Sequence, residues 1–244
     1  MLLILTYHRV GDEKFSNQLP LLESHLQYLS ETYSVVLPEE PLEKKKLSLC
    51  LTFDDAFFDF YHYVFPLLQK FKIRALLSVP TKFILETTDQ SVKSRLSVPY
   101  YEAMKGEIWK KRAPFCTFEE LEEMVSSGFV EVASHSHSHL NLTNPGVDVA
   151  HEITHSQKIL EERLPQKIST FVFPFGKANS KLQEEVSKHY TYSMRIGSAL
   201  NWGWHPKRKV LNRVNADNLH HPLEPFRKRK LSFYYSKALI NCLR

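Results

Sequence analysis

Seven apolar runs alternate with amphipathic stretches along the 244 residues of this chain, and this alternation restricts the folds that it can adopt. The runs are rich in β-branched and aromatic residues and lie near 2–7, 48–54, 73–79, 129–134, 168–173, 190–196 and 210–214. Stretches with helical periodicity lie near 19–32, 58–71, 117–128, 147–164 and 179–188. Strands that alternate with crossover helices build a parallel sheet, and seven of them predict an α/β barrel, closed or nearly closed. We expect residues 1–244 to form one domain, because barrels of this length are commonly single domains.

Two of these runs end in groups of ionisable side chains. The run 48–54 leads into the adjacent carboxylates of Asp54 and Asp55. The run 129–134 is followed by His135, His137 and His139. Adjacent buried carboxylates repel each other, so they need a cation or separate roles. His135 and His139 share a face of either a strand or a helix, because they are four residues apart. An Asp-Asp pair alone more often marks a turn, but together with these histidines it favours a divalent metal site with positions open for water and substrate.

Composition is that of an ordinary folded enzyme domain, with 43% hydrophobic and 24% charged residues. No apolar stretch approaches the roughly 20 residues of a membrane span. The opening run Met1–Leu5 is too short for a signal peptide and is predicted to be a strand. The three cysteines (Cys50, Cys116 and Cys242) lack metal-ligand spacing and are expected to be reduced. These features predict a cytoplasmic location.

The net charge of +5 is concentrated in the segment 205–244, which has ten Lys or Arg against Asp217 and Glu224. Basic and aromatic residues are interleaved over 226–235. Such a segment suits peripheral contact with an anionic membrane or an anionic glycan carrier, or it is a solvated terminal helix. A nucleic acid partner is not expected, because no recognised nucleic-acid-binding motif accompanies the charge.

The connection 86–114 is unusually long for a barrel of this kind. It contains Tyr100, Tyr101, Trp109 and the basic triplet 110–112. Connections of this length commonly serve as lids over an active site. We expect a lid insertion that presents aromatic faces to sugar rings, or else a solvated surface excursion.

The motifs resemble those of a known family in type and order. Thr52-Phe53-Asp54-Asp55-Ala56 resembles the T-F-D-D-G motif of the polysaccharide deacetylases (carbohydrate esterase family four, or NodB-homology domain). The run 135–139 fits that family's H-[S/T]-x-x-H motif, and 173–176 resembles its third motif, which ends in P-[Y/F]-G. Tyr7-His8 resembles the Tyr-His start of the branch that deacetylates poly-N-acetylglucosamine. The resemblance covers nearly the whole chain and implies a distorted (β/α)7 barrel, similar to a TIM barrel, with its site at the carboxyl ends of the strands.

The resemblance implies a role for several of these residues. Asp55, His135 and His139 would hold Zn²⁺, with Co²⁺ or Ni²⁺ as alternatives, and a water whose pKa the metal lowers. Asp54 would be the general base. The N–H of Phe175 would stabilise the oxyanion that forms when an acetamide is attacked.

A histidine is expected to protonate the leaving amine, and the Tyr-His start favours His8. His205, His220 and His221 are alternatives, although each lies in a polar or basic stretch. The sequence departs from the family pattern at Ala56, which replaces a glycine, and at Val172, where many members have an arginine that orients the base. Another group is therefore expected to hold Asp54.

The resulting expectation is a metal-dependent hydrolase that removes an acetyl group from an N-acetylated amino sugar. Its substrate would be a glycan, or a lipid-linked or nucleotide-linked precursor, contacted by Pro174, Tyr7 and Trp109. One alternative is a barrel amidohydrolase, suggested by the His135–His137 pair, or a phosphohydrolase acting on a small metabolite. The other is a glycan-binding protein without turnover.

Overall fold

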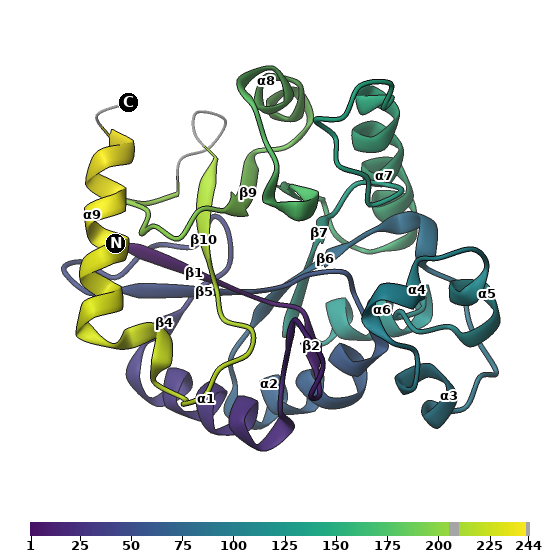
Figure 1. The fold of residues 1–244 in the computed structure, drawn as a ribbon, viewed down its shortest axis with the longest axis horizontal. Coiled ribbons are helices and arrows are strands. Elements are labelled where there is room, and N and C mark those ends of the chain that lie inside the picture. Colours follow the sequence, from purple (N-terminus) through teal and green to yellow (C-terminus); the bar gives the residue numbers. More distant parts are fainter. Residues whose placement is uncertain (205–209, 243–244) are drawn as a thin grey trace.

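Seven parallel strands close into a barrel in the computed structural model of the chain, which describes residues 1–204 and 210–242 (Figure 1). They are β1 (Leu2–Tyr7), β5 (Ser48–Phe53), β6 (Ala75–Val79), β7 (Val130–Ser134), β8 (Thr170–Val172), β9 (Tyr192–Ile196) and β10 (Leu211–Asn215). β1 closes the barrel because it pairs with β5 on one side, with Leu5 opposite Leu51, and with β10 on the other, with Leu5 opposite Val214. The predicted (β/α)7 barrel is therefore confirmed, with all seven expected strands in place.

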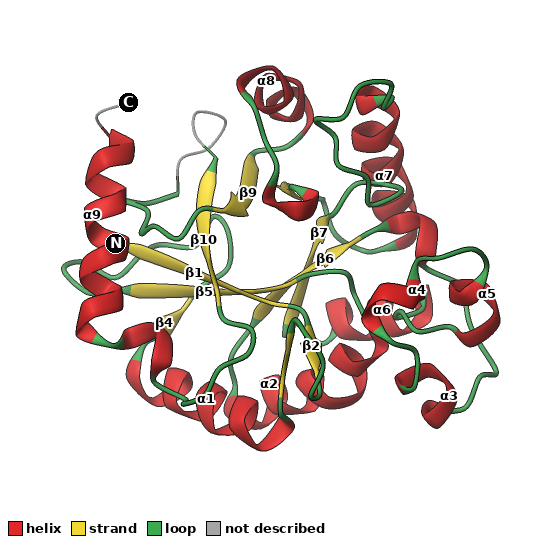
Figure 2. Cartoon of the chain, in the orientation of Figure 1, coloured by secondary structure: helices red, strands yellow, loops and turns green. Residues whose placement is uncertain are grey.

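Helices surround this barrel (Figure 2). The principal ones are α1 (Leu19–Thr32), α2 (Phe65–Phe71), α6 (Phe118–Ser126), α7 (Val149–Arg163), α8 (Ser180–His189) and α9 (Lys228–Cys242). The single helix expected over 58–71 is divided into a π-helical turn, η1 (Phe60–Val64), and α2. Pro66, which has no N–H to donate to the preceding turn, lies at the start of α2 directly after η1. In the part of the chain that the structure describes, no helix has the length and apolar character needed to span a membrane.

Short elements complete the chain between the barrel strands and the outer helices. They are β2 (Arg9–Val10), β3 (Ser16–Asn17), β4 (Ser34–Val35), η2 (Thr81–Phe83), η3 (Pro174–Gly176) and η4 (Glu224–Phe226). β2 pairs with β3 in a separate two-stranded sheet, and β4 extends the barrel sheet beside the start of β5. η3 follows β8 directly and is the short turn that carries the third motif.

Alternate residues of the strands belong to two separate hydrophobic clusters. One cluster, with Leu3, Leu5, Leu49 and Leu51 among its members, lies between the strands and the helices. The other includes Leu2, Ile4, Cys50, Leu76, Ala133, Val172, Met194 and Leu211. Successive side chains of a strand point to opposite faces, so the second cluster fills the inside of the barrel. This alternation also fixes which residues face inward at the carboxyl ends.

The segment 86–114 is folded against the barrel. It forms α3 (Val92–Leu96), α4 (Tyr100–Ala103) and α5 (Ile108–Arg112). Arg95 of α3 attaches this segment to the residues that follow it. Its buried guanidinium pairs with Glu120 at 2.6 Å and donates to the carbonyl of Phe115. The same guanidinium lies 3.5 Å from the centre of the Phe58 ring. The segment is thus an ordered insertion, and its role as a lid stays a prediction.

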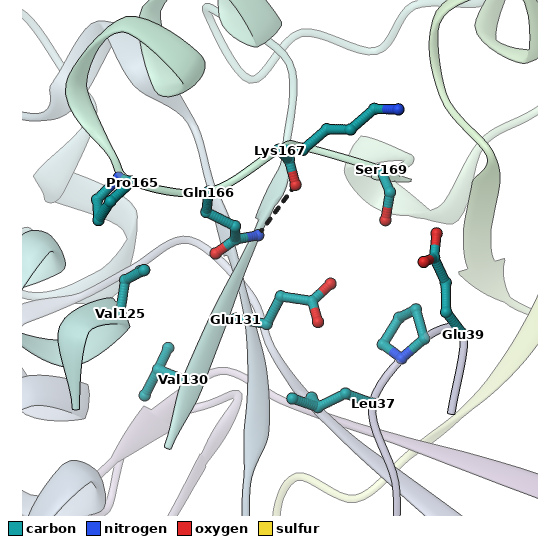
Figure 3. Close-up of a pocket in the computed structure, with 10 residues that line it drawn as sticks. Leu37, Glu39, Val125, Val130, Glu131, Pro165, Gln166, Lys167 and Ser169 are labelled. Carbon is teal, nitrogen blue, oxygen red and sulfur yellow. Dashed lines mark hydrogen bonds between the residues drawn. The ribbon is translucent and has the colours of Figure 1, made fainter. Parts of the chain in front are cut away.

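A pocket at the amino ends of the strands lies on the opposite side of the barrel from the motif residues (Figure 3). Val130 and Glu131 begin β7, and Ser169 immediately precedes β8. Glu131 points into this pocket. Burial, together with the nearby charges of Glu39 and Glu40, raises the pKa of Glu131 to about 7.

Glu131→Gln is expected to raise the melting temperature at about pH 8.5 and to leave it nearly unchanged at about pH 4. A raised carboxyl pKa means that the folded state holds the proton more tightly than the unfolded state. The resulting stability is present below the ordinary value of 4.5 and is lost as the pH rises through about 7. Ionised Glu131 would cost up to about 3 kcal/mol. Thermal unfolding at both pH values, with the exposed Glu119→Gln as control, measures the effect. An equal change at both would contradict it.

Candidate active site

The inward-facing positions of the strands become polar at the carboxyl end of the barrel. The alternation that places Ile4 and Cys50 inside continues to Thr6 and Thr52, and then to His8 and Asp54 just beyond the strand ends. In the same way Leu76 is followed by Ser78, Ala133 by His135, and Leu211 by Arg213. Polar groups from five strands or strand ends therefore converge at one end of the barrel.

Asp54 is held by a buried arginine from the last strand. Arg213 on β10 donates from Nη1 to Oδ1 and from Nη2 to Oδ2 of Asp54, both at 2.7 Å. The Ser78 hydroxyl donates to Oδ1 of Asp54 at 2.7 Å. Burial alone would raise the pKa of Asp54, but the Arg213 charge outweighs it and holds that pKa well below its ordinary value. Asp54 is therefore ionised and fixed in one orientation.

Arg213 is the group that was expected to hold Asp54. It takes the part of the motif arginine, whose position is occupied by Val172. It is fully buried and also donates to the Thr52 hydroxyl at 3.0 Å. No short motif contains it, because it lies 159 residues from Asp54 along the chain. The sequence feature that could have identified Arg213 is that it is the single charged residue in the apolar run 210–214, at an inward-facing position.

Asp55, His135 and His139 come together beside Asp54, with their candidate ligand atoms all within 4.8 Å of one another. Oδ1 of Asp55 lies 3.1 Å from Nε2 of His139 and 3.6 Å from Nε2 of His135. Nδ1 of His135 is hydrogen-bonded to the Val172 carbonyl at 2.8 Å, which leaves Nε2 as the free ligand atom. Burial lowers the pKa of His135 to about 4, so this imidazole is neutral near pH 7.

These three residues fit a divalent metal ion. Oδ1 of Asp55 is buried and has no hydrogen-bond partner among the described residues. A buried carboxylate oxygen without a donor is costly, and a cation held by two imidazoles would satisfy it. Burial opposes the charge of Asp55, but His139 and His135 lower its pKa to about 2, so the carboxylate is ionised.

Positive backbone φ angles separate the two adjacent carboxylates. Asp55 has φ 71° and Ala56 has φ 51°, in the left-handed region that glycine adopts most easily. This accounts for the glycine of the family motif at the position of Ala56. His139 (φ 52°) and Phe175 (φ 57°) are in the same region.

His8 has a carboxylate partner of its own. Its Nδ1 lies 2.7 Å from Oδ2 of Asp217, and its backbone N–H donates to Oδ1 at 3.0 Å. Its Nε2 faces Oδ2 of Asp54 at 3.8 Å. Burial opposes the charged imidazole, but the hydrogen bond to Asp217 and the carboxylates of Asp217 and Asp54 outweigh it and raise the pKa of His8 to about 9. His8 is therefore protonated near pH 7, and sequence reasoning missed the partner that keeps it so.

Two aromatic residues border the group of ionisable side chains. Tyr100, from the inserted segment, donates its hydroxyl to Oδ2 of Asp55 at 3.0 Å. Phe175 is 58% exposed, and its ring lies 4.9 Å from that of His139. Pro174 is buried at the start of η3, directly after β8. The third motif and the inserted segment thus approach the metal-ligand set from different elements.

The side chains of two residues expected to bind substrate make no described contact with this group, and their role at the substrate stays a prediction. Tyr7 is 1% exposed, stacks on Phe53 and bonds His25 through its hydroxyl at 2.7 Å. Its side chain is part of the core beneath the site. Trp109 is half-buried on α5 and packs edge-on against Phe83, with ring centres 5.8 Å apart. It lies in the inserted segment without a described contact to the ionisable group.

The alternative acids are not part of this group where they are described. His220 and His221 are both exposed, and each is tied to its own loop, by a bond from the His220 N–H to Glu224 and from the Leu223 N–H to His221. His205 lies outside the described residues. The histidine that the structure brings next to Asp54 is His8.

The sequence profile of the polysaccharide deacetylases matches residues 42–193, which is more than half of the chain. This range contains Asp54, Asp55, His135, His139 and the third motif. The chain belongs to the polysaccharide deacetylase family. Two parts of the site fall outside the matched range in this deacetylase-family chain, namely His8 with Asp217 and the arginine Arg213.

Curated relatives of this family member include the poly-β-1,6-N-acetyl-D-glucosamine N-deacetylases of Escherichia coli. The one from strain K12 is 27% identical over 177 residues, which cover 61% of this chain and 24% of the relative. The match thus spans about a quarter of the relative's length. The one from strain O157:H7 is 26% identical over the same share of each chain.

Solved deacetylase structures have the same fold. The polysaccharide deacetylase BC0361 of Bacillus cereus superposes with a TM-score of 0.74 at 19% identity, covering 94% of this chain and 68% of that one. The deacetylase PplD of Streptococcus pyogenes, solved with acetate, gives a TM-score of 0.71 at 21% identity, covering 92% and 96%. The barrel is therefore shared across sequences that have diverged widely.

His135→Ala is expected to remove one equivalent of bound Zn²⁺, because two ligands would remain where three converge. Elemental analysis after dialysis measures the loss, and circular dichroism verifies that the barrel is still folded. The exposed His220→Ala provides a control that should retain all of its metal. Undiminished metal in folded His135→Ala would disprove the assignment of this ligand.

Proposed function

We propose that this chain is a metal-dependent N-deacetylase that removes the acetyl group from an N-acetylated amino sugar. The observation that carries the proposal is the pairing of an ionised Asp54 with a protonated His8, 3.8 Å apart and beside three metal ligands. Hydrolysis of an amide needs a base for the attacking water and an acid for the leaving amine. Both groups are in the required protonation state near pH 7.

Asp55, His135 and His139 would hold the metal. A divalent ion held there acidifies water and polarises a carbonyl oxygen. Asp54 accepts the proton of the attacking water, and Arg213 keeps its carboxylate ionised and aligned. His8 donates its Nε2 proton to the leaving nitrogen, and Asp217 keeps that proton on the imidazole. The Phe175 N–H is proposed as the donor to the oxyanion.

The proposed metal is Zn²⁺, with Co²⁺ or Ni²⁺ as alternatives, because one carboxylate and two imidazoles suit these borderline ions. The proposed substrate is a β-1,6-linked polymer of N-acetylglucosamine or a precursor of it, lipid-linked or nucleotide-linked. The activity of the Escherichia coli relatives, which are poly-β-1,6-N-acetyl-D-glucosamine N-deacetylases, supports this choice. The aromatic rings of Tyr100 and Phe175 at the edge of the site suit a sugar ring.

Helix α9 supports a further proposal, that the protein binds peripherally to anionic membranes. It exposes large apolar side chains together with basic ones: Phe233, Tyr235, Leu239, Ile240, Lys228 and Arg229. Apolar and cationic groups on one helix favour the interface of an anionic bilayer. Sedimentation with phosphatidylserine vesicles, compared with neutral vesicles, tests this contact. The cytoplasmic location stays a prediction.

Acetate release from β-1,6-linked N-acetylglucosamine oligomers, with and without added Zn²⁺, tests the function. Asp54→Asn is expected to keep the metal and to lower the rate by about 10²–10⁴, because the amide cannot accept the proton. Bound metal without acetate release by the unaltered protein would contradict the proposal and favour a glycan-binding protein. Loss of metal from Asp54→Asn, in a variant that circular dichroism shows to be folded, would instead make Asp54 a ligand.

Asp217→Asn is expected to shift the alkaline limit of kcat/KM to lower pH. His8 is an acid only while protonated, so activity falls as the pH rises through its pKa of about 9. The asparagine removes the hydrogen-bonded carboxylate that raises this pKa, and the fall should begin at least one pH unit lower. The pH profile of kcat/KM, which reports ionisations of the free enzyme, measures the shift.

Glu224→Gln is a matched control for this prediction, because that carboxylate lies in the same C-terminal region and pairs with Lys230 rather than His8. It should leave the alkaline limit unchanged. An unchanged limit in active Asp217→Asn would show that His8 is not the acid.

A further inference from the structure

A second group of three histidines lies outside the barrel, behind the loop that carries His135 and His139. It consists of His137 from this loop and of His151 and His155 from α7. Ligand nitrogens of the three rings all lie within 4.8 Å of one another. The ring centres of His137 and His155 are 4.6 Å apart, and those of His151 and His155 are 4.7 Å apart.

A turn in the loop, in which Ser136 has φ 65°, separates this group from the catalytic site. His135 and His139 turn towards Asp55, whereas His137 between them contacts α7. α7 packs on the outer side of the barrel next to β7 (Figure 1). His151 and His155 are one helical turn apart and therefore project from the same face of α7.

Hydrogen bonds hold His137 and its loop in position. Nδ1 of His137 is hydrogen-bonded to the hydroxyl of Thr81 at 2.9 Å, which leaves Nε2 as the free ligand atom. The His137 N–H donates to the carbonyl of Glu152 at 3.1 Å, and the Ser138 N–H donates to the Glu152 carboxylate at 2.7 Å. The loop is thereby tied to the first turns of α7.

We propose that His137, His151 and His155 bind a second divalent ion of the late first transition row, Zn²⁺ or alternatively Ni²⁺ or Cu²⁺. Three imidazoles are a sufficient protein ligand set for such an ion and leave a position for water. A hydrogen bond on the far nitrogen of a ligating ring, as Thr81 provides for His137, is the usual outer support of a metal site. His151 is exposed, so an ion can enter from solvent.

The residues 151–155 have the H-E-x-x-H pattern of zinc-binding helices. In peptidases with this pattern the glutamate acts as a general base. Here Glu152 is 4% exposed and its carboxylate accepts the Ser138 N–H, so it is engaged in fixing the loop. The structure therefore assigns metal binding to this site and no hydrolytic chemistry.

Metal stoichiometry in a background that lacks the catalytic ligands tests the proposal. A variant with His135→Ala and His139→Ala should still bind one equivalent of Zn²⁺ from low micromolar solution in equilibrium dialysis. Adding His151→Ala and His155→Ala should abolish this binding. Adding the exposed His189→Ala of α8 instead is a matched control that should not change it. No bound Zn²⁺ in the first variant, or equal binding after His151 and His155 are removed, would overturn the site.

Two further measurements keep the test independent of folding and of the proposed deacetylase activity. With the catalytic ligands intact, His151→Ala with His155→Ala should lower the Zn²⁺ content from two equivalents to one, and circular dichroism should show an unchanged fold. Thr81→Val should weaken Zn²⁺ binding at the second site by about 10–100-fold, because the far nitrogen of His137 loses its support. Unaltered affinity in Thr81→Val, measured in the background without catalytic ligands, would contradict the role of His137.

Discussion

The ion pair between Arg213 and Asp54 is the interaction on which the rest of the site depends. Each partner is almost completely buried, and two charges in such surroundings are tolerated only when they are paired and hydrogen-bonded. Both oxygens of Asp54 receive a guanidinium nitrogen, and Ser78 and Thr52 supply further contacts. The pair joins β10 to the end of β5 across β1, the strand that closes the barrel. Removing one partner would leave a buried charge without compensation, which typically costs about 3–5 kcal/mol.

Two separate partners shift the pKa of the acid and the pKa of the base in opposite directions. Arg213 keeps the pKa of Asp54 low, and Asp217 keeps the pKa of His8 high, although their side chains are only 3.8 Å apart. Opposite shifts in neighbouring groups are the arrangement that lets one site donate and accept protons at one pH. Without Asp217, only the carboxylates of Asp54 and Asp55 would oppose the effect of burial, and the pKa of His8 would be lower.

Much of the fold and part of the site could be predicted from the sequence, for a physical reason. The seven strands are buried, so they can be recognised in the sequence as apolar runs. The short motifs that follow two of these runs contain Asp54, Asp55, His135 and His139. Arg213 is 159 residues from its partner Asp54, and Asp217 is 209 residues from its partner His8. No local sequence pattern therefore identifies either pair. His151 and His155 have a local pattern, but their third partner lies on another element. Tyr7 was expected at the substrate, yet its place in β1 points it into the layer beneath the helices.

The replacement of the motif arginine by Val172 is explained by the position of Arg213. Val172 faces the barrel interior and is fully buried, and its carbonyl bonds the ligand His135. Asp54 can accept one bidentate guanidinium, and that position is filled from β10. A second arginine at position 172 would add a buried charge without a carboxylate partner and would crowd Met194 and Leu211 inside the barrel. Valine at 172 and arginine at 213 are therefore complementary: one strand supplies the charge that orients the base, and the other supplies the apolar packing and the carbonyl that orient the metal ligand.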